Sequence, residues 1–279
     1  MCKRGAVEIM KKAGKIIWFV ICFCMVAFSG VKLYGIYSGY RTGTKAYEKL
    51  EEQYIVIQSG EATDNGKNGR KTSENEDVNV AKSEEPVTIS VDFTELKEVY
   101  GDVIAWIYCP NTPINYPVVQ STDNDYYLHR LITGEYNAGG TLFMDFRNSS
   151  DFSDWNSIIY GHNMKNDSMF GILPDYMEQE FYEEHPVWYL VTEEYTYQIE
   201  LVGGYVTAAD SSSYDFPEDA AGRDTLANMA SRKSSFRSDV KVEEEDRLVT
   251  MSTCVYDYED SRYVLVGILR EFGQLDEES

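Results

Sequence analysis

The sequence predicts a mainly β protein: a closed barrel of about eight strands with flanking helices, preceded by one N-terminal transmembrane helix. Short runs rich in β-branched and aromatic residues follow one another through the C-terminal part of the chain, separated by turn residues. An uncharged apolar run stands near the N-terminus. Between these two parts lies a stretch rich in Gly, Asn, Ser, Lys and Glu, which divides the chain into an anchor and a folded domain.

Residues 1–37 are expected to form a cytoplasmic basic tail and a single-pass anchor in the cell membrane. Ile16–Val31 is uncharged and mostly apolar, and with a snorkelling Lys32 the span reaches about 20 residues. Basic residues precede it, so the positive-inside rule places the N-terminus in the cytoplasm and the rest of the chain outside. A cleaved signal peptide is the alternative, because Val26–Gly30 offers small residues, but the apolar run is longer than usual for that role.

Residues 38–90 are expected to form an extracellular stalk and a flexible linker. Arg41–Ile57 has apolar residues at helical spacing, which predicts a short helical stalk. Ser59–Pro86 has too few apolar residues to bury a core, so we expect a flexible tether there.

Charge separates along the chain. Six Lys and Arg residues against one Glu give residues 1–37 a net charge of +5, so residues 38–279 carry −27 and the whole chain −22. An acidic extracellular part argues against nucleic acid as a partner.

The folded domain is expected over residues 91–273, with an acidic tail at 274–279. It begins with a helix, because Asp92 and Glu95 have the spacing of a capping box and Gly101 can close the helix. Strands are predicted at Val103–Tyr108, Ile114–Val119, Gly140–Phe146, Ser157–Tyr160, Val187–Val191, Thr196–Val206, Leu248–Cys254 and Tyr263–Leu269. Two more helices are predicted at Pro174–Glu184 and Thr225–Ser235.

Three residues with reactive or charged side chains stand at the ends of predicted strands. Cys254 ends one strand, Arg262 stands eight residues later at the start of the next, and His162 follows a strand ninety-two residues before the cysteine. A free thiol with a pKa of about 8.5 is mostly protonated at neutral pH and needs a base, which His162 can supply. The guanidinium of Arg262 suits a carbonyl oxygen that acquires negative charge. These are the parts of a cysteine acyl-transfer site for an amide or ester substrate.

Other titratable residues in the domain have weaker patterns around them. His129 and His185 stand in no motif, and we interpret both as structural residues. Asp257 and Asp260 lie between the cysteine and the arginine, where either could orient the catalytic imidazole as in a triad, although loop carboxylates are usually just solvated. Cys109 is interpreted as a buried free thiol, because pairing it with Cys254 would disable the nucleophile. No Cys/His cluster has zinc-ligand spacing and no glycine-rich loop suggests a phosphate site, so no metal or cofactor is expected.

The motifs around these residues resemble the sortases, membrane-anchored cysteine transpeptidases of Gram-positive bacteria. The likeness rests on Tyr160-Gly161-His162, on Ser252-Thr253-Cys254 and on Arg262 in the following strand, and it runs from about Asp92 to Phe272. Further motifs are similar to the class B branch: Asp92–Leu96, Trp106-Ile107, Ile114–Val118, Phe143–Asn148 and Met169-Phe170.

The resemblance implies a sortase-type barrel in which His162, Cys254 and Arg262 are catalytic. The cysteine would attack the Thr carbonyl of a C-terminal sorting signal of a surface protein and pass the acyl group to an amine, usually of a cell-wall precursor or peptidoglycan. Ser252 matches a position that lines the family's substrate groove, and we add Thr253 and Tyr160 as predicted substrate-binding residues. Class B enzymes typically prefer signals of the Asn-Pro-X-Thr-Asn type. In the family, the segment that corresponds to the loop 210–219 and the helix after it forms one wall of the groove.

Several alternatives stay open at this point. A pilin-polymerising sortase would use a pilin lysine as the amine, and a noncatalytic extracellular binding module could keep the same residues without turnover. A papain-type peptidase is disfavoured because its cysteine precedes its histidine in the chain. An L,D-transpeptidase is disfavoured because its Ser-His-Gly-Cys-type motif is absent.

Overall fold

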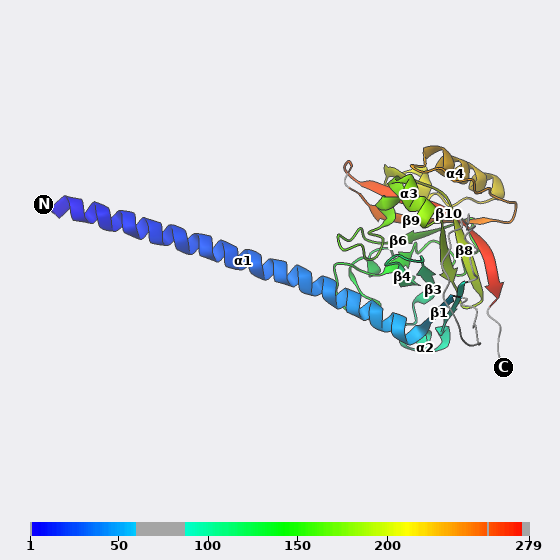
Figure 1. Cartoon of the computed structure of the whole chain (residues 1–279), viewed down its shortest axis with the longest axis horizontal. Coiled ribbons are helices and arrows are strands. Elements are labelled where there is room, and N and C mark those ends of the chain that lie inside the picture. Colours follow the sequence, from blue (N-terminus) through cyan, green and yellow to red (C-terminus); the bar gives the residue numbers. More distant parts are fainter. Residues whose placement is uncertain (1, 60–86, 256, 275–279) are drawn as a thin grey trace, which may run out of the picture.

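Eight strands form a closed barrel in the order β10-β8-β7-β3-β4-β5-β6-β9, which confirms the predicted fold (Figure 1). The protein is seen here as a computed structural model that describes residues 2–59, 87–255 and 257–274. Pairs β4–β5 and β6–β9 are parallel and the other neighbours are antiparallel. The barrel strands are β3 (Val103–Tyr108), β4 (Asn115–Val119), β5 (Leu142–Met144), β6 (Asn156–Tyr160), β7 (Val187–Val191), β8 (Tyr195–Ala208), β9 (Arg247–Cys254) and β10 (Ser261–Gln274).

The strand ends differ from the sequence-based bounds where pairing, and not hydrophobicity, sets them. The sequence predicts Gly140–Phe146 as one strand, but β5 is shorter, because Gly140 has a positive φ of 59° and Asp145 begins a turn closed by the Asn148 N–H. The reverse holds for β10, which pairs with β8 well beyond the apolar run Tyr263–Leu269.

The short helices also depart from the predicted ranges. Helix α2 (Phe93–Val99) has Asp92 as its N-cap, accepting from the Glu95 N–H at 2.9 Å. Tyr100 is its C-cap, so the predicted closing residue Gly101 is the first residue beyond the cap. The predicted helix Pro174–Glu184 is instead two pieces, η2 (Leu173–Met177) and α3 (Gln179–Glu184), because the residue between them is extended. Helix α4 (Ala220–Lys233) begins before the predicted Thr225, since Asp219 caps it through the Gly222 N–H. The 3-10 turns η1 (Tyr127–His129) and η3 (Ser212–Tyr214) complete the domain.

One continuous helix, α1 (Cys2–Tyr54), covers both the predicted anchor and most of the predicted stalk helix (Figure 1). Within Trp18–Tyr54 it is long and apolar enough to cross a membrane by length and composition, with a mean hydropathy of 2.0 in the most apolar window. The predicted stalk helix to Ile57 is wrong at its end, because Ile55–Ser59 forms strand β1 with β2 (Val87–Val91). The rest of the predicted tether lies outside the described residues, as do residues 275–279 of the predicted acidic tail.

Large aromatic side chains fill the barrel and satisfy their own polar atoms. The Trp106 Nε1–H donates to Asn115 at 2.6 Å, and the Trp188 Nε1–H donates to the Tyr176 hydroxyl at 2.7 Å. Both indoles are fully buried. Cys109 is a buried free thiol whose pKa burial raises to about 12, which confirms the interpretation drawn from the sequence.

We expect Asp92→Ala to lower the free energy of unfolding by about 1 kcal/mol, because the substitution removes an N-cap bond from α2. Urea denaturation of the variant and the parent chain measures the difference. Glu98→Ala, at an exposed position of the same helix, is the control and should change stability by no more than about 0.5 kcal/mol. Equal effects of the two substitutions would contradict the capping role.

Candidate active site

The register of three strands brings the predicted catalytic residues onto one face. Tyr160 at the end of β6 lies opposite Ser252 of the parallel strand β9, and Cys254 lies opposite Arg262 of β10. Side chains alternate along a strand, so the residues two positions beyond Tyr160 and Ser252 continue on the same face. Those residues are His162 and Cys254, and the arginine faces the same way as its cross-strand partner. Strand pairing therefore brings the imidazole, the thiol and the guanidinium to one face.

A groove of about 470 Å³ opens at this end of the barrel. All six residues that the sequence predicts for the site line it, three as catalytic and three as substrate-binding residues. The full lining is Asn124, Leu128, His129, Phe143, Arg147, Tyr160, Gly161, His162, Ala209, Tyr214, Ser252, Thr253, Cys254 and Arg262.

Hydrogen bonds carry the β6–β9 pairing past the last strand residue. The Gly161 N–H donates to the Ser252 carbonyl at 3.1 Å, and the Thr253 hydroxyl donates to the Gly161 carbonyl at 2.8 Å. The Asn163 side chain donates to the Cys254 carbonyl at 2.8 Å. Gly161 has no room for a side chain, because a Cβ there would stand 2.4 Å from Leu142 Cδ2. Bonds from Gly161 and Asn163, on either side of His162, and from Thr253, just before Cys254, thus fix the backbone at both catalytic residues.

His162 is oriented by a backbone carbonyl. Its Nε2 lies 2.7 Å from the Leu128 oxygen, which can only accept, so Nε2 carries a proton and a neutral ring keeps Nδ1 as its acceptor. Burial lowers the pKa of His162 below 6.5, and His129 adds to the effect while the Leu128 carbonyl opposes it. A base that is neutral at physiological pH suits the activation of a thiol.

His129 is a groove residue and not the structural residue that the sequence suggests. Its exposed ring stacks on the His162 ring with centroids 5.4 Å apart and planes 14° apart. The polar stretch around His129 carries no motif that would reveal this, since the contact arises only when η1 folds beside the end of β6. His185 lies outside the groove, where its ring contacts Phe181 at 4.6 Å.

Asp257 and Asp260 are exposed on the loop between β9 and β10. The ring nitrogen of His162 that a triad carboxylate would bind is already bonded to the Leu128 carbonyl. A carbonyl thus holds the imidazole where the triad hypothesis would put a loop aspartate.

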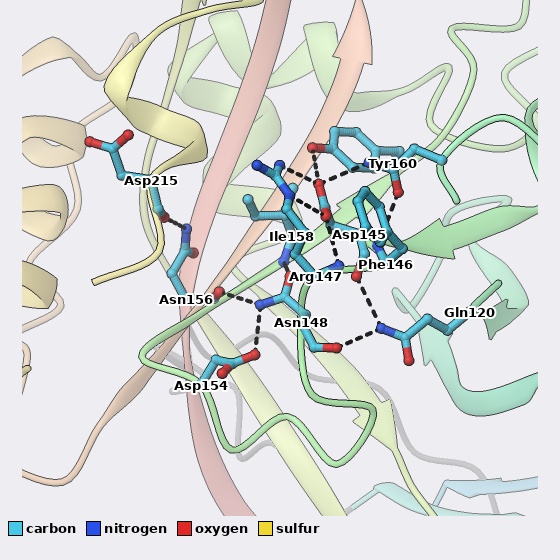
Figure 2. A network of polar contacts seen from close by, with 11 residues as sticks. Gln120, Asp145, Phe146, Arg147, Asn148, Asp154, Asn156, Ile158, Tyr160 and Asp215 are labelled. Carbon is cyan, nitrogen blue, oxygen red and sulfur yellow. Dashed lines mark hydrogen bonds and ion pairs between the residues drawn. The ribbon is translucent and has the colours of Figure 1, made fainter. Parts of the chain in front are cut away.

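A buried carboxylate forms the base of one groove wall. Asp145 is fully buried, receives two bonds from the Arg147 guanidinium at 2.8 and 2.7 Å, and accepts from the Tyr160 hydroxyl at 2.9 Å (Figure 2). Burial by itself would raise the pKa of Asp145, but these bonds and one from Asn124 outweigh it and hold the pKa below its usual value. Arg147 also lies over the Phe216 ring at 4.4 Å. The carboxylate thus fixes Tyr160 and Arg147.

The loop 210–219 also lines the groove, as the resemblance implies for this loop, and packs against Tyr160 and Arg147. Tyr214 of η3 lies with its hydroxyl 2.8 Å from the Ser252 Oγ, and its ring stacks on Tyr160 at 6.2 Å. Burial raises the pKa of Tyr214 to about 12, so its hydroxyl stays protonated. Residues of α4 are not among those that line the groove. Among the described residues, no group of three or more His, Cys, Asp or Glu side chains is arranged to hold a metal ion.

Comparison with known proteins gives consistent matches. The family model for the sortase domain matches residues 107–270. Sortase B of Listeria monocytogenes is 33% identical over 244 residues, which cover 84% of this chain and 91% of that protein. The Staphylococcus aureus sortase B–substrate complex superposes with a TM-score of 0.61 at 32% identity, over 65% of this chain and 85% of that chain. Sortase B from B. anthracis in complex with AAEK1 gives a TM-score of 0.66 at 29% identity, over 85% and 100% of the two chains.

A closed mixed barrel with a thiol, an imidazole and a guanidinium facing one groove has the parts that cysteine-dependent acyl transfer needs. The matches agree with this chemistry: the chain belongs to the sortase family, in its class B branch. It is accordingly a transpeptidase that anchors surface proteins.

We expect the His162 imidazole to titrate with a midpoint below 6.5, because its burial disfavours the charged ring. NMR titration of the Cys254→Ala variant measures this without thiolate pairing, and His162→Gln assigns the resonance. Adding His129→Gln should raise the midpoint, since the substitution removes a second imidazole that opposes protonation. A midpoint at or above the ordinary histidine value in the Cys254→Ala chain would contradict the lowering of the His162 pKa by burial.

Proposed function

We propose that this enzyme cleaves a C-terminal sorting signal after its Thr residue and joins the acyl group to an amine of the cell wall. The observation that carries the proposal is the single groove in which Cys254, His162 and Arg262 share one face. The relative from Staphylococcus aureus was solved as a complex with its substrate on the same fold. A groove of about 470 Å³ has room for several residues of an extended peptide.

The proposed reaction has two acyl transfers. The Cys254 thiol gives its proton to His162 as its sulfur attacks the Thr carbonyl, and a tetrahedral intermediate forms with its negative oxygen facing Arg262 and a backbone N–H. His162 protonates the leaving amine as the C–N bond breaks, which leaves a thioester on the cysteine. The acceptor amine then attacks the thioester and gives a proton to His162. The C–S bond breaks as the new amide bond forms, and His162 returns the proton to the departing thiolate.

Arg262 is placed for this role by its strand partner. It lies opposite Cys254 on β10 and uses one Nη1–H on the Ser261 carbonyl at 3.0 Å. The planar guanidinium has five N–H donors in all, so most of its N–H groups remain available to bind the oxyanion. The Val255 N–H is bonded to Ser261, so the backbone donor of the oxyanion site is a different one.

We propose Tyr160, Ser252 and Thr253 as substrate-binding residues with different contributions. The hydroxyls of Ser252 and Tyr214 lie within 2.8 Å of each other and present a polar pair to the peptide. Tyr160 offers its ring, since its hydroxyl is bonded to Asp145. Thr253 uses its hydroxyl on Gly161, so it shapes the groove through the strand.

We also propose a single-pass topology with the N-terminus in the cytoplasm and the barrel outside. The support is the apolar part of α1, which is long enough to cross a membrane, and the basic residues that precede it.

The full chain in detergent should cleave a sorting-signal peptide after Thr and ligate it to a glycine-based amine. A library of quenched fluorescent peptides, followed by mass spectrometry, identifies the preferred signal, and Cys254→Ala is expected to give no product. A pilin lysine peptide as competing acceptor distinguishes a pilin polymerase. No turnover of any peptide, with Cys254 also inert to alkylation, would favour the binding-module alternative.

Arg262→Lys should lower kcat by about 10²-fold or more, because lysine keeps the charge but loses the planar fork. Steady-state kinetics with the preferred peptide measures the loss. Arg270→Lys, on the same strand but outside the groove, is the matched control and should keep kcat within about twofold. Near-parental turnover by Arg262→Lys would overturn the oxyanion assignment.

A further inference from the structure

The C-terminal turns of α1 pack against the barrel. One face of this helix is buried at Gly43, Tyr47, Leu50 and Tyr54, a spacing that follows a single helix face. The cavity that remains between helix and barrel is only about 20 Å³, so the joint is close-packed. Figure 1 shows the helix reaching the barrel at this end and leaving it toward the N-terminus. We call this contact the α1 joint.

The α1 joint bonds to the loop before β5. The Tyr47 hydroxyl lies 2.8 Å from both the Gly140 carbonyl and the Thr141 hydroxyl. The Asn137 side chain donates to the Gly39 carbonyl of the helix at 2.9 Å. Burial raises the pKa of Tyr47, so its hydroxyl remains a donor.

The same loop holds η1 by its backbone. The Thr141 N–H donates to the Tyr127 carbonyl at 3.1 Å, the Thr141 hydroxyl to Arg130 at 2.8 Å, and the Asn137 N–H to His129 at 3.0 Å. The two backbones approach closely at Gly140, which has a φ of 59° and where a Cβ would stand 2.6 Å from the carbonyl oxygens of Tyr127 and Leu128. Any shift of this loop is therefore passed to η1.

Turn η1 in turn holds the catalytic imidazole. Its Leu128 carbonyl is bonded to His162 Nε2 at 2.7 Å, and its His129 ring stacks on the His162 ring. A second route reaches the same residue, because buried Met164, two positions after His162, lines the α1 joint. Helix and imidazole are thus linked through packed, hydrogen-bonded neighbours.

We propose that residues 39–47 of α1 position His162 for catalysis, with Tyr47 acting on it through Gly140 and Leu128. Tyr47 is a positioning residue, because it touches neither the groove nor the cysteine. The helix that carries the candidate membrane span then also contributes to the geometry of the active site. The inference rests on the proposed function only for its kinetic readout.

The test compares Tyr47→Phe with Tyr54→Phe in the full chain in detergent. Tyr54 is a buried tyrosine of the same helix, and its hydroxyl accepts a bond from the adjacent Gln53 at 3.0 Å. Removing this hydroxyl is the matched control, because it breaks a bond within the helix and none to the loop before β5. Tyr47→Phe should lower kcat about tenfold, with KM within about twofold, because a displaced base weakens catalysis more than binding. Tyr54→Phe should leave both constants near the parental values. Gly43→Val, which places a β-branched side chain against the Asn137 amide that bonds to the helix, should reproduce the loss.

An NMR titration of His162 in the Cys254→Ala chain gives a readout that is independent of turnover. Adding Tyr47→Phe should lower the midpoint, because the Leu128 carbonyl raises the pKa of His162 and its bond is weakened. The other charged or titratable groups of the groove, His129, Arg147, Tyr160, Tyr214 and Arg262, are unchanged in this comparison. A parental midpoint and parental kcat in both Tyr47→Phe and Gly43→Val would overturn the proposal, as would an equal loss in Tyr54→Phe. A shifted midpoint in a chain that turns over no peptide would support the positioning role and count against the proposed function alone.

Discussion

Parallel pairing of β6 with β9 joins two segments that are ninety-two residues apart between His162 and Cys254. A slip of one residue in this register would turn one of the two side chains to the other side of the sheet. The bonds from Gly161, Thr253 and Asn163 across the two strands prevent that slip beyond the last ladder residue. Antiparallel pairing of β10 with β9 then adds Arg262 to the same face. The chemistry of the groove follows from these two registers.

The groove walls are held by polar groups buried beneath them. Asp145 is fully buried, and the free-energy cost of burying its charge is offset by hydrogen bonds from Arg147, Tyr160 and Asn124. Because those donors line the groove, the carboxylate converts a set of mobile side chains into a fixed surface. His162 is held differently, by one backbone carbonyl that leaves its second nitrogen to act as a base. Rigidity and reactivity thus come from separate parts of the site.

The α1 joint extends this support to the N-terminal helix. The loop before β5 contacts α1 through Tyr47 on one side and η1 through Thr141 on the other. Gly140 permits both contacts, since its positive φ and missing side chain let the backbones approach. In the proposed topology, the helix that anchors the enzyme also orients its base, which couples the catalytic geometry to the membrane-proximal segment.

The sequence by itself determined the barrel class and all six predicted residues of the groove, because strand-ending motifs such as Tyr160-Gly161-His162 and Ser252-Thr253-Cys254 are local patterns. It also determined the Asp92 cap, which depends on residues three apart. Only the tertiary structure decided the roles of His129, Asp145 and Tyr47, because each depends on a partner that folding brings from another element. The same reason explains the missed β1–β2 pair and the true length of β10: a strand's extent is set by its partner's hydrogen bonds, which no single stretch of sequence contains.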